Sequence, residues 1–131
     1  MKVKIPGLFL LAAFAGLHLA PPVALAHHGQ AAYETSKELT LHATMTGFEW
    51  ANPHCFLRFD AIDDKGKVQH WTVEAISPLM LSRYGWTRSS LKPGDMVTVV
   101  FRPAKNGDTT GILERVILAD GRELSGRQSG N

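Results

Sequence analysis

The stretch LTLHATMTGFEW, residues 39–50, alternates apolar and polar side chains and then changes phase at a single glycine. Up to Met45 the odd-numbered residues are apolar, whereas after Gly47 the apolar side chains are Phe48 and Trp50. A period of two predicts a β-strand with one buried face. A glycine at a change of phase predicts a β-bulge that bends the strand. We therefore expect one long, bent first strand.

Four further segments have the composition and period of strands, and a short segment between them has the signals of a helix. Ser77 is a suitable N-cap, Pro78 suits the first helical position, and Gly85 ends the helix. This order predicts an all-β fold with one short helix, a small OB-like Greek-key barrel of five to six strands. A small β-sandwich is the alternative, although it usually needs about seven strands. The expected strands are residues 55–62, 68–75, 96–102 and 112–118, with a short last piece at 122–124.

The first 26 residues have the pattern of a secretory signal peptide. Two lysines precede an apolar stretch at residues 5–19, and Ala24-Leu25-Ala26 is an A-x-A cleavage pattern. Cleavage between Ala26 and His27 predicts a periplasmic or secreted protein without a membrane span in its mature form. The expected parts are then a signal peptide (1–26), a lead (27–37), the barrel (38–124) and a disordered tail (125–131).

Charge and cysteine usage narrow the function classes. The chain has 14 basic and 12 acidic residues, and loss of the two lysines in residues 1–26 leaves twelve of each. A net charge of zero argues against a nucleic-acid partner. The only cysteine, Cys55, excludes an internal disulfide. Because Cys55 is in phase with Leu57 and Phe59, we expect its side chain in the core.

Five blocks of sequence resemble a family of exported bacterial proteins that is catalogued only as a domain of unknown function. The resemblance implies export and a small β-rich fold, and it supplies no activity. The blocks are HHGQAAY (27–33), FEWANPH (48–54), SPLMLSRYGW (77–86), LKPGD (91–95) and PAKNG (103–107).

Two histidines directly follow the expected cleavage point. An N-terminal histidine chelates a metal with its α-amine and its ring, and a second histidine ring completes a three-nitrogen site that suits Cu(II). His27, His28 and His54 are the candidate copper ligands, because His54 ends the loop between the first two strands. No Cys-x2-Cys spacing favours zinc. The alternatives are that the histidine pair is accidental and that the His54 ring bonds a backbone carbonyl in a turn.

A metal-free interaction module, binding a small molecule or protein partner, is the alternative function. OB-folds bind ligands beside the loops that here span residues 51–54 and 103–111. Trp71 and Trp86 are expected in the core. The candidate contact residues are Trp50, Asn52, Lys105 and Asn106.

An exported enzyme is a second alternative. Neither a G-x-S-x-G elbow nor a Gly-rich phosphate loop is present in the sequence. Glu74 and Arg83 are placed to form a structural ion pair between the third strand and the helix. We therefore expect binding rather than catalysis.

Overall fold

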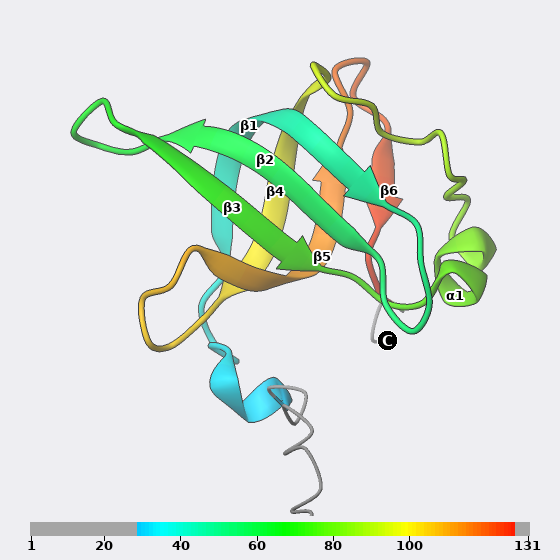
Figure 1. Cartoon of the computed structure of the whole chain (residues 1–131), viewed down its shortest axis with the longest axis horizontal. Helices are drawn as coiled ribbons and strands as arrows, with labels where there is room; N and C mark the ends of the chain where they lie inside the picture. The colour runs from blue at the N-terminus through cyan, green and yellow to red at the C-terminus, as the bar shows by residue number, and fades with distance from the viewer. Residues whose placement is uncertain (1–28, 128–131) are drawn as a thin grey trace, which may run out of the picture.

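The computed structural model describes residues 29–127, and six strands and one short α-helix make up about half of that part (Figure 1). A 3-10 helix, η1, precedes the first strand. The elements are η1 (Gln30–Ala32), β1 (Leu39–Glu49), β2 (Phe56–Ile62), β3 (Val68–Glu74), α1 (Pro78–Arg83), β4 (Met96–Pro103), β5 (Thr110–Ile117) and β6 (Glu123–Ser125).

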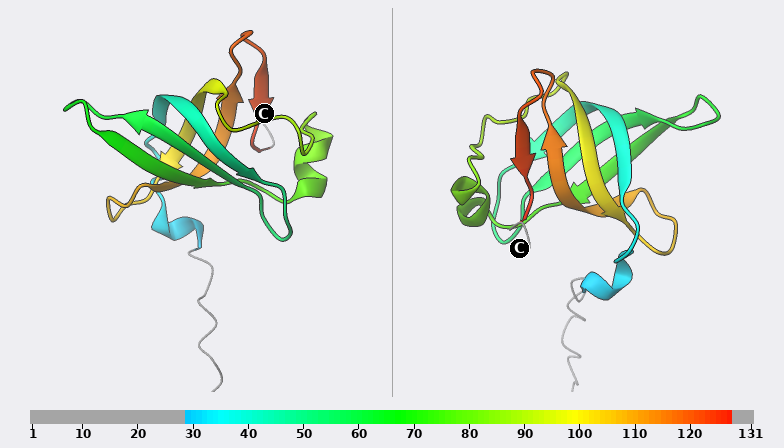
Figure 2. Two further views of the ribbon diagram at one scale, coloured as in Figure 1. Left: turned by 45° about the horizontal axis from the view of Figure 1, so that its top comes forward. Right: turned by 180° about the vertical axis from the view of Figure 1, so that it is seen from behind.

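The first five strands close into a barrel. The hydrogen-bonded order is β3-β2-β1-β4-β5-β6, and β3 also pairs with β5, in parallel, over Thr72–Glu74. Around the barrel the order of the strands is thus β1-β2-β3-β5-β4, and β6 is added outside the barrel beside β5 (Figure 2). Along the chain, the helix lies between β3 and β4. The predicted all-β barrel with one short helix is confirmed.

β1 bends where the sequence changes phase. Its pairing with β2 shifts register between Met45 and Gly47, so that Thr46 is the extra residue of a β-bulge. β1 pairs with β4 only before the bulge, over residues 39–44, whereas its pairing with β2 begins at Thr44 and continues across the bulge to Glu49. Ala43 and Met45 are buried in the core, whereas Phe48 packs against the core from the other side of the bulge. One strand therefore contributes to two walls of the barrel.

Cys55 and Trp86 lie in the core as expected, whereas Trp71 is only partly buried and packs against it. Cys55 is fully buried, and Trp86 is almost so. The Trp86 indole Nε1 donates a hydrogen bond to the Ser125 carbonyl at 2.7 Å, which holds β6 against the segment that follows α1. Trp71 packs against Phe101 with ring centroids 4.9 Å apart. The core therefore contains side chains from each of the five barrel strands.

The helix has the predicted ends. The Ser77 hydroxyl accepts a hydrogen bond from the Met80 amide, Pro78 begins the helix, and Gly85 has a φ of 83° just after it. Among residues 29–127, no helix has the length and apolarity needed to span a membrane.

The last described residues contact the barrel. Ser125 belongs to β6, and Arg127 forms an ion pair with the buried Glu114 of β5, at the start of the segment expected to be a tail. The expected signal peptide and the two adjacent histidines lie outside the described residues.

Candidate functional site

His54 ends the loop between β1 and β2. The Asn52–Pro53 peptide bond in this loop is cis. The Cys55 amide donates to the Ile76 carbonyl at 3.2 Å, and the Ala75 amide donates to the Cys55 carbonyl at 2.8 Å. These bonds hold the end of the loop beside the end of β3, although regular pairing of β2 begins only at Phe56. The His54 backbone therefore lies next to the last residues of β3.

The His54 imidazole contacts a carboxylate. Its Nδ1 contacts Glu74 Oε1, and the side chains of His54 and Glu74 are 38% and 27% exposed. The expected pairing of Glu74 with Arg83 is wrong, because Val73 is buried in the barrel and alternation directs Glu74 outward, toward His54.

This contact determines which ring nitrogen of His54 is the donor. A carboxylate accepts a hydrogen bond from Nδ1–H, and in the neutral ring the lone pair then lies on Nε2. Histidines that bind metals commonly have this arrangement, with the second nitrogen donating to a carboxylate that orients the ring. The pair therefore has the chemistry of a metal ligand and its orienting group.

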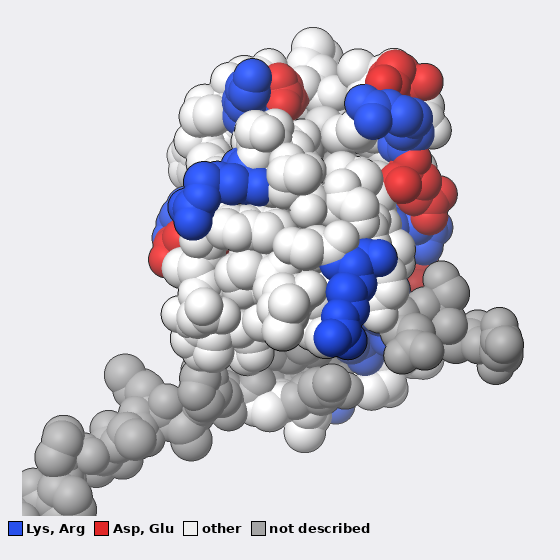
Figure 3. Space-filling model, turned by 90° about the vertical axis from the view of Figure 1, so that its right-hand side faces the viewer, with Lys and Arg blue, Asp and Glu red and all other residues white. Residues whose placement is uncertain are grey.

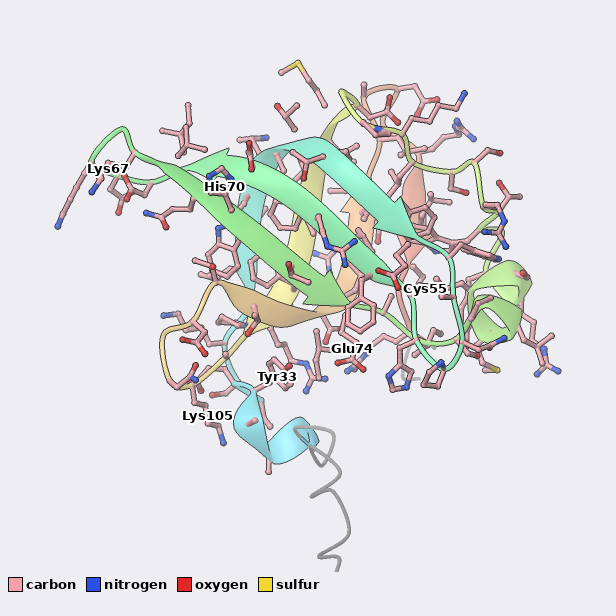
Figure 4. All side chains as sticks on the ribbon, in the orientation of Figure 1. Tyr33, Cys55, Lys67, His70, Glu74 and Lys105 are labelled. Atoms are coloured by element: carbon pink, nitrogen blue, oxygen red, sulfur yellow. The ribbon has the colours of Figure 1, made fainter. Side chains whose placement is uncertain are left out.

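Tyr33 connects the lead to the same region. Tyr33 is only 8% exposed and forms an isolated β-bridge with Ala104. The Glu34 amide donates to the Pro103 carbonyl at 2.9 Å, and the Lys105 amide donates to the Ala32 carbonyl at 3.0 Å. Burial raises the pKa of Tyr33, and the negative charge of Glu74 raises it further. Figure 4 labels Tyr33 on the lead and Glu74 at the end of β3.

A buried ion pair supports the barrel wall behind this region. Glu74 of β3 lies beside Ile112 of β5, and Ile112 lies beside Arg102 of β4. Arg102 Nε lies 2.8 Å from Glu114 Oε1, at an angle too poor for a hydrogen bond. Arg127 Nε is 2.9 Å from the other oxygen of Glu114. One buried carboxylate thus joins two guanidinium groups across β4, β5 and the end of the described chain.

The contact residues expected for a metal-free partner lie on two separate loops. Trp50 is half-buried with its ring 5.8 Å from that of Phe48, and Asn52 is exposed in the β1–β2 loop. Lys105 and Asn106 are exposed in the β4–β5 loop, where the Asn106 amide donates to Asp108 at 2.7 Å. The lead passes between these loops in all three ribbon views (Figures 1 and 2). The structure therefore does not bring the two pairs together.

The other described histidines lie on strands. His70 Nδ1 is 2.6 Å from Asp60 Oδ1, and His42 Nδ1 is 3.1 Å from Thr98 Oγ1. Among residues 29–127, no three His, Cys, Asp or Glu side chains are grouped so that they could hold a metal ion. His27 and His28 precede this part of the chain, so the structure does not place them.

The sequence prediction missed Glu74 and Tyr33 as parts of this region. Alternation along residues 68–75 would have directed Glu74 outward, because Trp71, Val73 and Ala75 share the buried face. It gave no indication that His54 lies opposite Glu74, since this depends on the pairing of Cys55 with residues 75 and 76.

Comparison with known families gives one match. The sequence profile of DUF6152, described as a family of unknown function, matches residues 17–114. This range contains the histidine pair, Tyr33, His54 and Glu74. No curated protein and no solved structure matches the chain.

Proposed function

The chain belongs to DUF6152, a family of unknown function, and we propose that it is an exported periplasmic protein that binds one copper ion at its mature N-terminus. Its ligands are the α-amine and ring of His27, with His28 providing a second chelating mode, and the ring of His54. The protein uses this site to bind copper, not to catalyse a reaction.

The contact between His54 and Glu74 carries this proposal. The carboxylate contacts Nδ1 and orients the ring, and metal-binding histidines commonly have a carboxylate in this position. The loop that presents His54 is held to β3 by two backbone hydrogen bonds at Cys55. The ring is therefore oriented before any metal arrives, which reduces the ordering needed on binding.

The course of the lead supports the choice of the other ligands. Tyr33 anchors the lead to the barrel near Glu74. His28 and His27 immediately precede Gly29, the first described residue. Gln30–Ala32 form a 3-10 helix, which rises only about 2 Å per residue, so the chain from Tyr33 back to His28 reaches less far than an extended segment of the same length. The proposal requires His54 to lie within this short reach.

The donor set favours copper. An amine and imidazole rings form a nitrogen site, and Cu(II) prefers tetragonal nitrogen ligands and has the highest affinity of the divalent first-row metals. The negative charge of Glu74 beside His54 further favours a bound cation. The amine becomes a ligand only after cleavage before His27, because an amide nitrogen in an uncleaved chain is a poor ligand.

Export and metal binding are tested together. The exported protein is purified, its N-terminus is sequenced, its intact mass is measured, and Cu(II) is titrated into the metal-free form under electron paramagnetic resonance. We expect a chain that starts at His27 and a nitrogen-rich signal at one copper per chain, lost in His54→Ala.

His70→Ala is the matched control. His70 also contacts a carboxylate, that of Asp60, but it lies on β3 with its side chain 81% exposed. We expect the copper signal of this variant to equal that of the wild type. Cleavage at another position, or equal loss of copper in both variants, would refute the proposal.

A further inference from the structure

Three basic side chains surround a groove beside the bulge of β1. The groove has a volume of about 640 Å³ and lies between the end of β1, the middle of β2 and the segment that precedes β4. Its lining combines Arg58, Arg88 and Lys92 with one acidic residue, Glu49. The groove therefore carries an excess of positive charge in a protein whose charges otherwise nearly cancel.

Only part of this charge is neutralised by the protein itself. Arg58 Nη2 donates to Glu49 Oε2 at 2.8 Å. The side chains of Arg88 and Lys92 make no ion pair or hydrogen bond with any other residue in the described range 29–127. Figure 3 shows that some basic side chains on the side of the molecule that carries α1 stand apart from acidic ones. Two cationic groups are thus available to a ligand.

The charge of Arg88 also acts on Cys55, which follows the β1–β2 loop. Burial raises the pKa of the Cys55 thiol, whereas the charge of Arg88 lowers it. Arg88 is exposed and lines the groove together with Glu49 and Lys92.

The groove also has an apolar floor. Phe48 packs against the core and against Trp86, with ring centroids 5.7 Å apart, and Leu91 is buried. Gly47, Ser89 and Pro93 also line the groove. Phe48 and Leu91 pack in or against the core, so the fold holds this apolar part of the lining in place. An open groove with a fixed apolar part and a few polar groups can accept a small molecule.

We propose that this groove binds a small organic anion that bears a carboxylate or phosphate group. The oxyanion lies between Arg88 and Lys92, and the apolar part of the ligand covers Phe48 and Pro93. Guanidinium groups bind the oxygens of either anion through paired hydrogen bonds. This site is independent of the proposed copper ligands, since it uses none of their side chains.

Citrate and inorganic phosphate are the probes. Each is titrated into isotope-labelled protein at low ionic strength, and the backbone amide shifts are followed by nuclear magnetic resonance. We expect saturable shifts at residues 47–49 and 88–92. Stronger binding of citrate identifies a carboxylate ligand, and stronger binding of phosphate identifies a phosphate ligand.

The double variant Arg88→Gln/Lys92→Gln tests the cations. Each exposed charge is worth about two- to fivefold in affinity, so the double variant should bind roughly tenfold more weakly. The matched control is Lys65→Gln/Lys67→Gln in the β2–β3 hairpin, which loses the same charge far from the groove (Figure 4, Lys67). Unsaturable shifts, shifts confined to other residues, or equal weakening in both double variants would overturn the proposal.

Discussion

Replacing Glu74 with glutamine would test whether this carboxylate orients His54 for metal binding. The variant loses the negative charge but keeps an oxygen that can accept from Nδ1, whereas Glu74→Ala loses both. Removing a carboxylate that orients a metal-binding histidine commonly weakens metal affinity ten- to a hundredfold, which is about 1.4–2.8 kcal/mol. We expect the alanine variant near the larger value and the glutamine variant near the smaller.

Folding should change much less than binding. The side chains of His54 and Glu74 are 38% and 27% exposed, and an ion pair with that exposure contributes about 1 kcal/mol or less. A loss of copper affinity with a nearly unchanged free energy of unfolding would therefore identify a role at the site.

The assay is a competition titration of Cu(II) against a chelator of known affinity, with urea unfolding measured on the same samples. Asp60→Asn is the control, because it removes the carboxylate that contacts His70. Wild-type copper affinity in Glu74→Ala, or an equal loss in Asp60→Asn, would refute the argument.

Three further predictions concern stability. Burial raises the pKa values of Cys55 and Tyr33 from 9.0 and 10.0, so the unfolded chain loses these protons first and the free energy of unfolding should fall as pH rises above about 9. Urea unfolding measured from pH 8 to 11 should show a shallower decline in the variant Cys55→Ala/Tyr33→Phe, and an unchanged slope would contradict this. Glu114→Gln leaves a buried guanidinium unpaired and should cost about 3 kcal/mol in urea unfolding, whereas a cost under 1 kcal/mol would show that the pair is not needed. Gly111→Ala would put a Cβ 2.4 Å from a ring carbon of β4 and 2.8 Å from a β4 backbone oxygen. The variant should therefore lose about 1–3 kcal/mol of the free energy of unfolding and melt at a lower temperature, and a wild-type melting temperature would mean that β4 can shift.

Glu114 illustrates a feature that periodicity does not reveal. The pairing of β4 with β5 shifts register between Val100 and Phe101, which makes Glu114 the extra residue of a bulge. No glycine or change of phase marks this bulge in the sequence, unlike the one at Gly47. The position of Glu114 therefore follows from how β4 and β5 pair. Its partner, Arg127, belongs to the tail that was expected to be disordered.

The sequence by itself determined the elements of this protein. Alternation in residues 39–50 encodes a strand with one buried face, Gly47 marks the bend, and Ser77, Pro78 and Gly85 limit the helix. These features depend on neighbouring residues, because backbone geometry repeats every two residues in a strand and capping acts within one turn. Burial of Cys55 followed from the same alternation.

Only the tertiary structure decided which side chains meet. Parallel closure of β3 on β5, docking of the lead through Tyr33, and the contact of Glu74 with His54 join residues far apart in the chain. Each depends on strand registers that are set by closure of the whole barrel, and no local pattern records them. The candidate histidines could therefore be identified from the sequence, whereas the carboxylate that orients His54 could not.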